Sequence, residues 1–167
     1  MRLITIIIFF VSFQSFSQNT KIFDQKYNDS LLVGECTLEA FKIAPYDEWF
    51  YNEYSEYHPN DSIINLLKNN ISDIEITIIL GVWCGDSRRE FPRFIKILDL
   101  INFNYTYLKI IAVDTKKEGV KIDINSYNIE LIPTIILYKQ NTEIGRIIEI
   151  PKKTLEYDIL TITKYLN

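Results

Sequence analysis

The sequence predicts an α/β fold with a central mixed sheet flanked by helices. Apolar runs of strand length alternate with segments of helical periodicity, and strands joined through helices pair in parallel. Residues 140–142, Gln-Asn-Thr, form a hairpin turn between the last two predicted strands, which implies an antiparallel pair. The chain has 167 residues, 47% of them hydrophobic, which is enough to bury one core of ordinary size.

Residues 1–18 have the pattern of a signal peptide. Arg2 supplies a positive start, Leu3 to Phe13 is nearly all apolar, and mostly small or polar residues follow as far as Asn19. A membrane-spanning helix needs roughly 20 apolar residues, and this run is shorter. We therefore expect an exported, periplasmic protein with no stable membrane span in the mature chain. An uncleaved N-terminal anchor is the alternative.

Residues 19–60 are predicted to form an N-terminal helical extension. We expect an irregular lead-in over 19–34 and two helical pieces over 35–57. Thr37 can cap the first piece, and Pro45 can open the second as a first-turn proline. The aromatic residues of the second piece have helical spacing, which favours core packing over a ligand site; they are Trp49, Phe50 and Tyr54.

Residues 61–167 are predicted to form the main domain. Its central feature is a largely β-branched apolar run, typical of a strand covered on both faces. The predicted elements, in chain order, are a helix capped by Asp61, a strand at Ile74–Leu80, a turn at 81–86, a helix at Ser87–Ile101 with Pro92 inside it, a strand at Leu108–Val113, a turn or short helix at Ile124–Ile129, strands at Thr134–Tyr138 and Glu143–Ile150, and a closing helix at Lys152–Leu166.

Composition narrows the classes of function. The formal net charge is −4, whereas a nucleic-acid partner would require a basic face. The single histidine, His58, lies beside Pro59 and is predicted to be on the surface. The usual clusters of metal ligands are absent from the sequence. We therefore predict no nucleic-acid partner, no metal and no cofactor.

Cys84 is the strongest candidate for a reactive group. It follows a predicted buried strand and precedes a predicted helix. The first turn of a helix presents unpaired N–H groups and the positive end of the dipole, which favour a thiolate over a thiol. Arg88 and Arg89 add positive charge nearby, whereas Asp86 acts in the opposite direction. We expect the net effect to favour the thiolate.

Two motifs resemble the thioredoxin superfamily. Trp83-Cys84-Gly85 after a strand, followed by Pro92 in the helix, resembles the active-site turn of thioredoxins, and Ile132-Pro133-Thr134 resembles their cis-proline loop. Gly145 matches a glycine commonly found in the last strand of this fold. The resemblance covers about residues 61–167 and implies a thioredoxin fold. The wider pattern, including the WCGDS (CxxS) motif, resembles exported bacterial thioredoxin-like proteins.

The resemblance implies a mechanism with one thiol. Thioredoxins have a second, resolving cysteine where this chain has Ser87. We therefore expect monothiol thiol–disulfide exchange through Cys84, with the Ser87 hydroxyl donating a hydrogen bond to the Cys84 sulfur. Trp83, Ile132, Pro133 and Thr134 are the implied substrate-binding residues. The implied partners are protein or small-molecule thiols and disulfides.

Two alternatives stay open at this point. The protein could be a redox-inactive thioredoxin-fold binding module, because a fold does not establish an activity; a peroxide-reducing thiol enzyme fits the motif less well. Cys36 could be a partly buried helix residue that only packs, or a resolving partner that replaces the cysteine missing at residue 87.

Overall fold

The computed structural model of the protein describes residues 18–164. Residues 1–17 of the predicted signal peptide and the end of the predicted closing helix at Leu166 lie outside these residues. The described chain forms one six-stranded mixed sheet with helices packed against it. Between residues 18 and 164, no helix is long and apolar enough to cross a membrane.

The sheet has the strand order β1-β2-β4-β3-β5-β6. β3 and β4 are parallel, and every other neighbouring pair is antiparallel. β3 lies near the middle and is almost fully buried, as expected for an isoleucine-rich strand covered on both faces. The bounds of the strands are β1 Thr20–Asp24, β2 Asp29–Cys36, β3 Ile74–Leu80, β4 Leu108–Ala112, β5 Thr134–Lys139 and β6 Thr142–Ile148.

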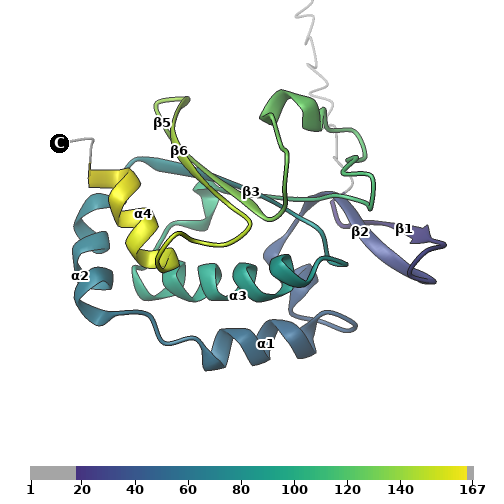
Figure 1. Cartoon of the computed structure of the whole chain (residues 1–167), viewed down its shortest axis with the longest axis horizontal. Coiled ribbons are helices and arrows are strands. Elements are labelled where there is room, and N and C mark those ends of the chain that lie inside the picture. Colours follow the sequence, from purple (N-terminus) through teal and green to yellow (C-terminus); the bar gives the residue numbers. More distant parts are fainter. Residues whose placement is uncertain (1–17, 165–167) are drawn as a thin grey trace, which may run out of the picture.

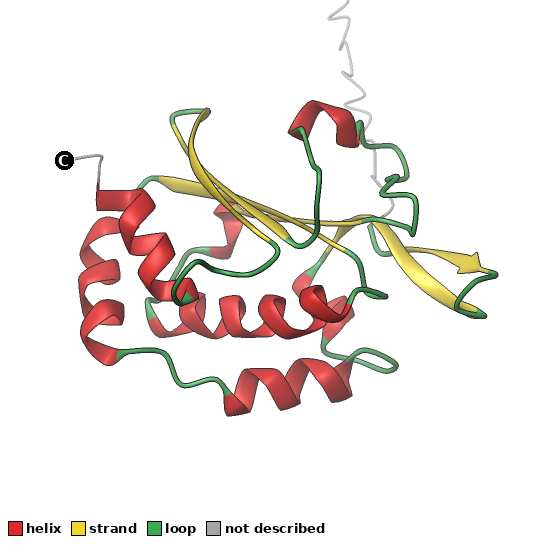
Figure 2. Ribbon diagram, in the orientation of Figure 1, coloured by secondary structure: helices red, strands yellow, loops and turns green. Residues whose placement is uncertain are grey.

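The N-terminal extension differs from its prediction. Residues 19–34 are not irregular, because β1 and most of β2 form a hairpin there, and β2 pairs with β4 of the main sheet. The first predicted helical piece is only a 3-10 helix, η1 (Leu38–Phe41). Cys36 is therefore a strand residue and not a helix residue. Figure 2 shows the hairpin projecting beyond the helical layer.

Four α helices lie on one face of the sheet (Figure 1). They enclose the larger hydrophobic core, which includes Phe50, Leu67, Phe91 and Ile159. The other face carries a smaller core, covered by the segment between β4 and β5 with its 3-10 helix η3 (Ile124–Tyr127). The helix bounds are α1 Asp47–Glu56, α2 Asp61–Asn70, α3 Gly85–Leu100 and α4 Leu155–Lys164, and a further 3-10 helix, η2, spans Tyr105–Tyr107.

The residues predicted to begin α1 and to cap α2 need correction. Pro45 does not open α1, which begins at Asp47; the Ala44–Pro45 peptide bond is cis and precedes the helix. Asp61 is the first residue of α2, and its cap is Asn60. The Asn60 Oδ1 atom accepts hydrogen bonds from the backbone N–H groups of residues 62 and 63, at 3.0 and 3.2 Å, which satisfies two otherwise unpaired donors.

Candidate functional site

Cys84 lies where β3 passes into α3. Its backbone is extended (φ −87°, ψ 126°), and it occupies the N-cap position of the helix. Its N–H donates to the Gly81 carbonyl, and its carbonyl accepts from the Arg88 N–H, both at 3.0 Å. The side chain is half-buried. Cys84 therefore lies at the end of a 16-residue helix where the dipole is positive.

The proline loop meets this turn directly. The Cys84 thiol donates to the carbonyl of Ile132 at 3.5 Å, although the two residues are 48 positions apart. The Ile132–Pro133 peptide bond is cis. Thr134 is buried at the start of β5, and its hydroxyl donates to the Leu131 carbonyl at 2.7 Å. The backbone around Pro133 is thus held against the cysteine.

Trp83 forms one wall of the site. Its indole N–H donates to the carbonyl of Val113 at 3.1 Å, which fixes the ring beside the end of β4. Gly81 lies under the ring, and a Cβ atom at that position would be only 2.7 Å from Nε1 of Trp83 and 2.9 Å from Cδ1 of Ile132. A glycine is therefore required for this close approach.

Ser87 makes a different contact from the one expected. Its side chain is buried in the first turn of α3, and its Oγ accepts a hydrogen bond from the Gly81 N–H at 3.2 Å. The Cys84 sulfur is instead engaged with the Ile132 carbonyl. The serine oxygen therefore supports the backbone that leads into the Trp83-Cys84 turn.

The charges beside Cys84 are largely paired with one another. Arg89 forms ion pairs with the carboxylates of Asp86 and Glu90, at 2.7 and 2.6 Å. The negative charge of Asp86 and the positive charge of Arg89 are therefore both neutralised by a partner. The Nε of Arg88 donates to the Val82 carbonyl at 2.6 Å, and this exposed residue makes no ion pair with residues 18–164. Arg88 is the remaining cation at this helix start.

Sequence reasoning missed Tyr27, which lies at the tip of the β1–β2 hairpin. Its ring is 6.1 Å from the Trp83 ring, measured between centroids, with an interplanar angle of 33°. Tyr27 was missed because residues 19–34 were interpreted as irregular. The turn-favouring residues Asn28 and Asp29 lie between two short apolar runs, Ile22-Phe23 and 31–33, and could have indicated a hairpin.

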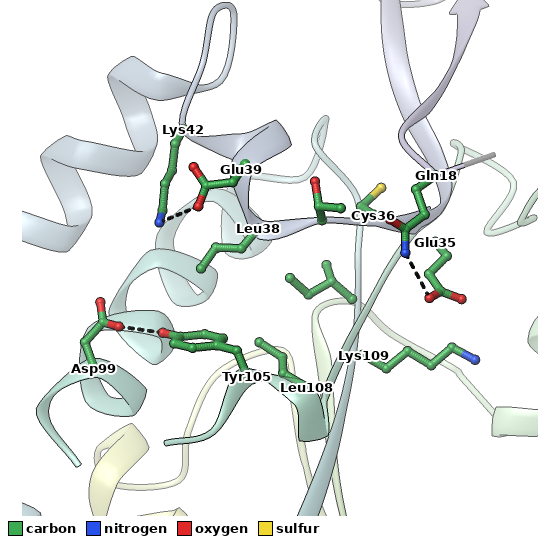
Figure 3. A pocket seen from close by; sticks show the side chains of 12 residues that line it. Gln18, Glu35, Cys36, Leu38, Glu39, Lys42, Asp99, Tyr105, Leu108 and Lys109 are labelled. Carbon is green, nitrogen blue, oxygen red and sulfur yellow. Dashed lines mark hydrogen bonds and ion pairs between the residues drawn. The ribbon is translucent and has the colours of Figure 1, made fainter. Parts of the chain in front are cut away.

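Cys36 lies in a different environment. It is 5% exposed on β2, and burial raises the pKa of its thiol to about 12. Its sulfur donates to the Gly34 carbonyl at 3.5 Å. Figure 3 shows the pocket of about 420 Å³ that Cys36 borders with Glu35 and Lys109. The lining of this pocket includes no residue from 81–88, so the two sulfurs are not brought together there.

Metal ligation has no candidate group in the described chain. No cluster of three histidine, cysteine or acidic side chains within residues 18–164 could hold a metal ion. His58 is exposed, and its Nδ1 lies 2.6 Å from the carbonyl of Glu56.

Several solved structures resemble this chain at low sequence identity. A protein of unknown function from Pseudomonas aeruginosa is 12% identical, with a TM-score of 0.60 over 81% of this chain and 94% of that chain. An HIV epitope scaffold is 14% identical, with a TM-score of 0.52 over 80% and 82%. Mitochondrial thioredoxin 3 from Saccharomyces cerevisiae, in its oxidised form, is 23% identical, with a TM-score of 0.34 over 57% and 86%.

The two structures with TM-scores above 0.5 bear on the fold only. No protein-family model and no curated protein matches the sequence. The prediction of an α/β fold with a mixed sheet flanked by helices is confirmed, and the strand order β4-β3-β5-β6 with its parallel and antiparallel pairs is that of a thioredoxin-like fold. A fold hosts many functions, so the activity must be argued from the site.

Proposed function

We propose that the protein is an exported thiol–disulfide exchange protein that works through the single thiol of Cys84. One observation carries the proposal: a half-buried cysteine at the start of α3 lies 3.5 Å from the carbonyl that precedes the cis Pro133 bond. A nucleophilic sulfur and a stretch of backbone able to align a peptide are thus side by side. The leader-like residues 1–18 support export.

The first step is attack by the Cys84 thiolate on one sulfur of a substrate disulfide. The new S–S bond joins Cys84 to that sulfur, while the other sulfur leaves with the electron pair and takes up a proton. Cys84 is oxidised and the leaving thiol is reduced. The attacking sulfur lies at the N-cap of α3, and the peptide groups beside Pro133 align the substrate as an added strand.

The second step requires a thiol from outside the protein. Residue 87 has a hydroxyl and not a thiol, and Cys36 is buried with a pKa raised to about 12. An external thiolate therefore attacks the substrate sulfur of the mixed disulfide, so that the substrate leaves in a disulfide with the external thiol and Cys84 is released as a thiolate. Glutathione-like small thiols or a protein thiol can supply this step.

Adduct formation tests the proposal. Purified mature protein is incubated with an oxidised peptide that contains one disulfide, and the products are measured by intact mass spectrometry without reductant. We expect one mixed disulfide on the wild type and on Cys36→Ser, and none on Cys84→Ser. An adduct on Cys84→Ser, or none on the wild type, would overturn the proposal.

A redox-inactive binding module is the second candidate. The observation that favours it is Ser87, whose buried oxygen is committed to the Gly81 N–H, so the turn is stable without a second thiol. Such a module would bind a peptide along the same proline loop with no covalent bond. Peptide binding that is equal in the wild type and in Cys84→Ser, with no adduct, would select this candidate.

A further inference from the structure

The tip of the β1–β2 hairpin is held in place beside the candidate site. Asp24 Oδ1 accepts hydrogen bonds from the backbone N–H groups of Lys26 and Tyr27, at 2.9 and 3.2 Å. Its other oxygen accepts from the Thr115 hydroxyl at 3.0 Å. Because Thr115 follows β4, this carboxylate ties the hairpin turn to the same end of the sheet as Cys84.

Tyr27 and Trp83 form a partly exposed pair of rings, here called the aromatic shelf. Tyr27 is 40% exposed although its ring packs 6.1 Å from that of Trp83. Trp83 is half-buried and anchored through its bond to the Val113 carbonyl. The Nζ atom of Lys26 lies 5.4 Å from the centroid of the Tyr27 ring. The shelf is thus built from two elements that are far apart in the sequence.

The aromatic shelf adjoins the proline loop at Gly81. The indole of Trp83 and the Cδ1 atom of Ile132 both approach Gly81 too closely for a Cβ atom to fit. The carbonyl of Ile132 in turn accepts a hydrogen bond from the Cys84 thiol. A peptide whose cysteine reacts with Cys84 would therefore place a neighbouring side chain within reach of the rings.

We propose that Tyr27 is a specificity-determining residue, and that the aromatic shelf binds an aromatic side chain next to the reacting cysteine of a polypeptide disulfide. This inference rests on the proposed exchange function and adds a substrate class to it. Ring faces at partial exposure recognise other rings through offset or edge-to-face contact. A small disulfide lacks such a side chain and gains nothing from the shelf.

Three reagents with the same leaving group test the inference. Two short acetylated peptides carry thionitrobenzoate on their only cysteine and differ in having phenylalanine or alanine beside it; the third reagent is N-acetylcysteine with the same group. Cys84 attacks the cysteine sulfur, a disulfide joins protein and peptide, and thionitrobenzoate leaves as a coloured thiolate. The rate of its release is measured, with Cys36→Ser as the common background.

We expect the phenylalanine peptide to react roughly threefold to tenfold faster than the alanine peptide, as the strength of an aromatic contact implies. Tyr27→Ala should bring the two rates together and leave the N-acetylcysteine rate unchanged, whereas Tyr27→Phe should keep the ratio. Tyr107→Ala is the matched control, because this 51% exposed tyrosine precedes β4 at the opposite end of the sheet.

The outcomes separate the two proposals. Equal rates for the two peptides on the wild-type site, or a ratio that survives Tyr27→Ala, would overturn the inference and leave exchange through Cys84 intact. Loss of the N-acetylcysteine rate in Tyr27→Ala would also overturn it, because the ring would then be supporting the turn and not binding substrate. Failure of all three reagents with every protein would overturn the exchange function and the inference with it.

Discussion

Cys36 and Cys84 carry the same group in very different surroundings. Cys36 is 5% exposed and faces the helix-covered core, where desolvation disfavours its charged form. Cys84 is half-buried at a helix start, and its sulfur lies 3.5 Å from the carbonyl of Ile132. The thiolate is the reactive species. Because both side chains carry the same thiol, the environment of each sulfur decides which one reacts.

Alkylation with iodoacetamide should therefore be confined to Cys84 near neutral pH. Since burial raises the pKa of Cys36 to about 12, only about one Cys36 thiol in ten thousand is ionised at pH 8 in the folded protein. The rate in Cys84→Ser should stay very low until the pH approaches 12 or the protein unfolds. Mass spectrometry of both single-cysteine variants measures this, and rapid labelling of Cys36 at pH 8 would contradict it.

Ser87→Cys should convert the protein into a dithiol reductant. Residue 87 is one helical turn after Cys84 and is buried against the Gly81 N–H, so a thiol there would attack the mixed disulfide within the molecule. Reduction of insulin with a dithiol donor should be slow for the wild type and for Ser87→Ala, and clearly faster for Ser87→Cys. Efficient reduction by the wild type would show that residue 87 is not limiting.

Gly81→Ala should displace the Trp83 ring. The added Cβ would lie 2.7–2.9 Å from atoms of Trp83 and Ile132, which is too close for either to stay in place. Overpacking of this kind costs about 1–3 kcal/mol. Gly85→Ala is the matched control, since a Cβ there meets nothing within 4 Å. Tryptophan fluorescence and thermal unfolding should change for the first variant only; an unchanged Gly81→Ala would refute the close packing.

At the scale of elements, local patterns predicted much of the fold. The bounds of β3 are confirmed residue for residue, because a run of isoleucines flanked by polar turns has few other interpretations. The hairpin was missed for two reasons. Gly34, with φ +94°, ends the short apolar run of β2, and the pairing of β2 with β4 depends on residues far along the chain.

Much of the candidate site was identified from residues within two motifs. Trp83, Cys84 and the Ile132-Pro133 loop are local signatures, and the structure places them together. The role of the Ser87 oxygen and the contact of Tyr27 with Trp83 were not predictable. Both depend on where distant backbone segments end up, which no local pattern in one sequence specifies.

Asp99 of α3 links this helix to α1 and η2, and its replacement should weaken the contacts among these three elements. Its two oxygens accept hydrogen bonds from the hydroxyls of Tyr54 in α1 and Tyr105 in η2, each at 2.7 Å. Burial first, and the bond to Asp99 second, raise the pKa of Tyr54 to about 12. Asp99→Asn should lower that pKa and reduce the free energy of unfolding by about 1 kcal/mol per weakened bond.

The contribution of Tyr54 to the stability of the fold depends on pH in a definite direction. A folded-state pKa above the ordinary tyrosine value of about 10 gives stability that is complete below pH 10 and is lost as the pH rises towards 12. Tyrosinate absorbance and urea unfolding between pH 9 and 12 measure both effects. Asp73→Asn removes the same charge from an exposed site and serves as the control. A Tyr54 titration that is unchanged in Asp99→Asn would contradict this prediction.

At the scale of the whole molecule, the fold is tied together from Asn19 onwards. Its side-chain oxygen accepts from the Thr37 N–H at 2.8 Å, and its own N–H donates to the Glu35 carbonyl at 3.0 Å. The polar break that predicts a cleavage site falls at the same residue. A chain that begins at Asn19 would keep both strands of the hairpin.

We expect the mature protein to begin close to Asn19. N-terminal sequencing and the intact mass of the exported protein measure this. Loss of residues 1–18, with Asn19 kept, should leave thermal stability unchanged. Truncation through β1 should lower it, because β1 covers the edge of β2. An intact Met1 on protein recovered from the cytoplasm would contradict export.

The two faces of the sheet also differ in how they can open. Four α helices cover one face, while the other is covered by a segment whose only described helix is the four-residue η3. Amide hydrogen exchange reports such differences as separate opening free energies, which are lowest where few apolar contacts hold the backbone. The covering segment includes Ile132, so each local opening would move the carbonyl that accepts the hydrogen bond of the Cys84 thiol while the helical layer stays folded. The frequency with which this segment opens would then set how often the Cys84 thiol is released from the carbonyl. The first amides to exchange would be those nearest Cys84.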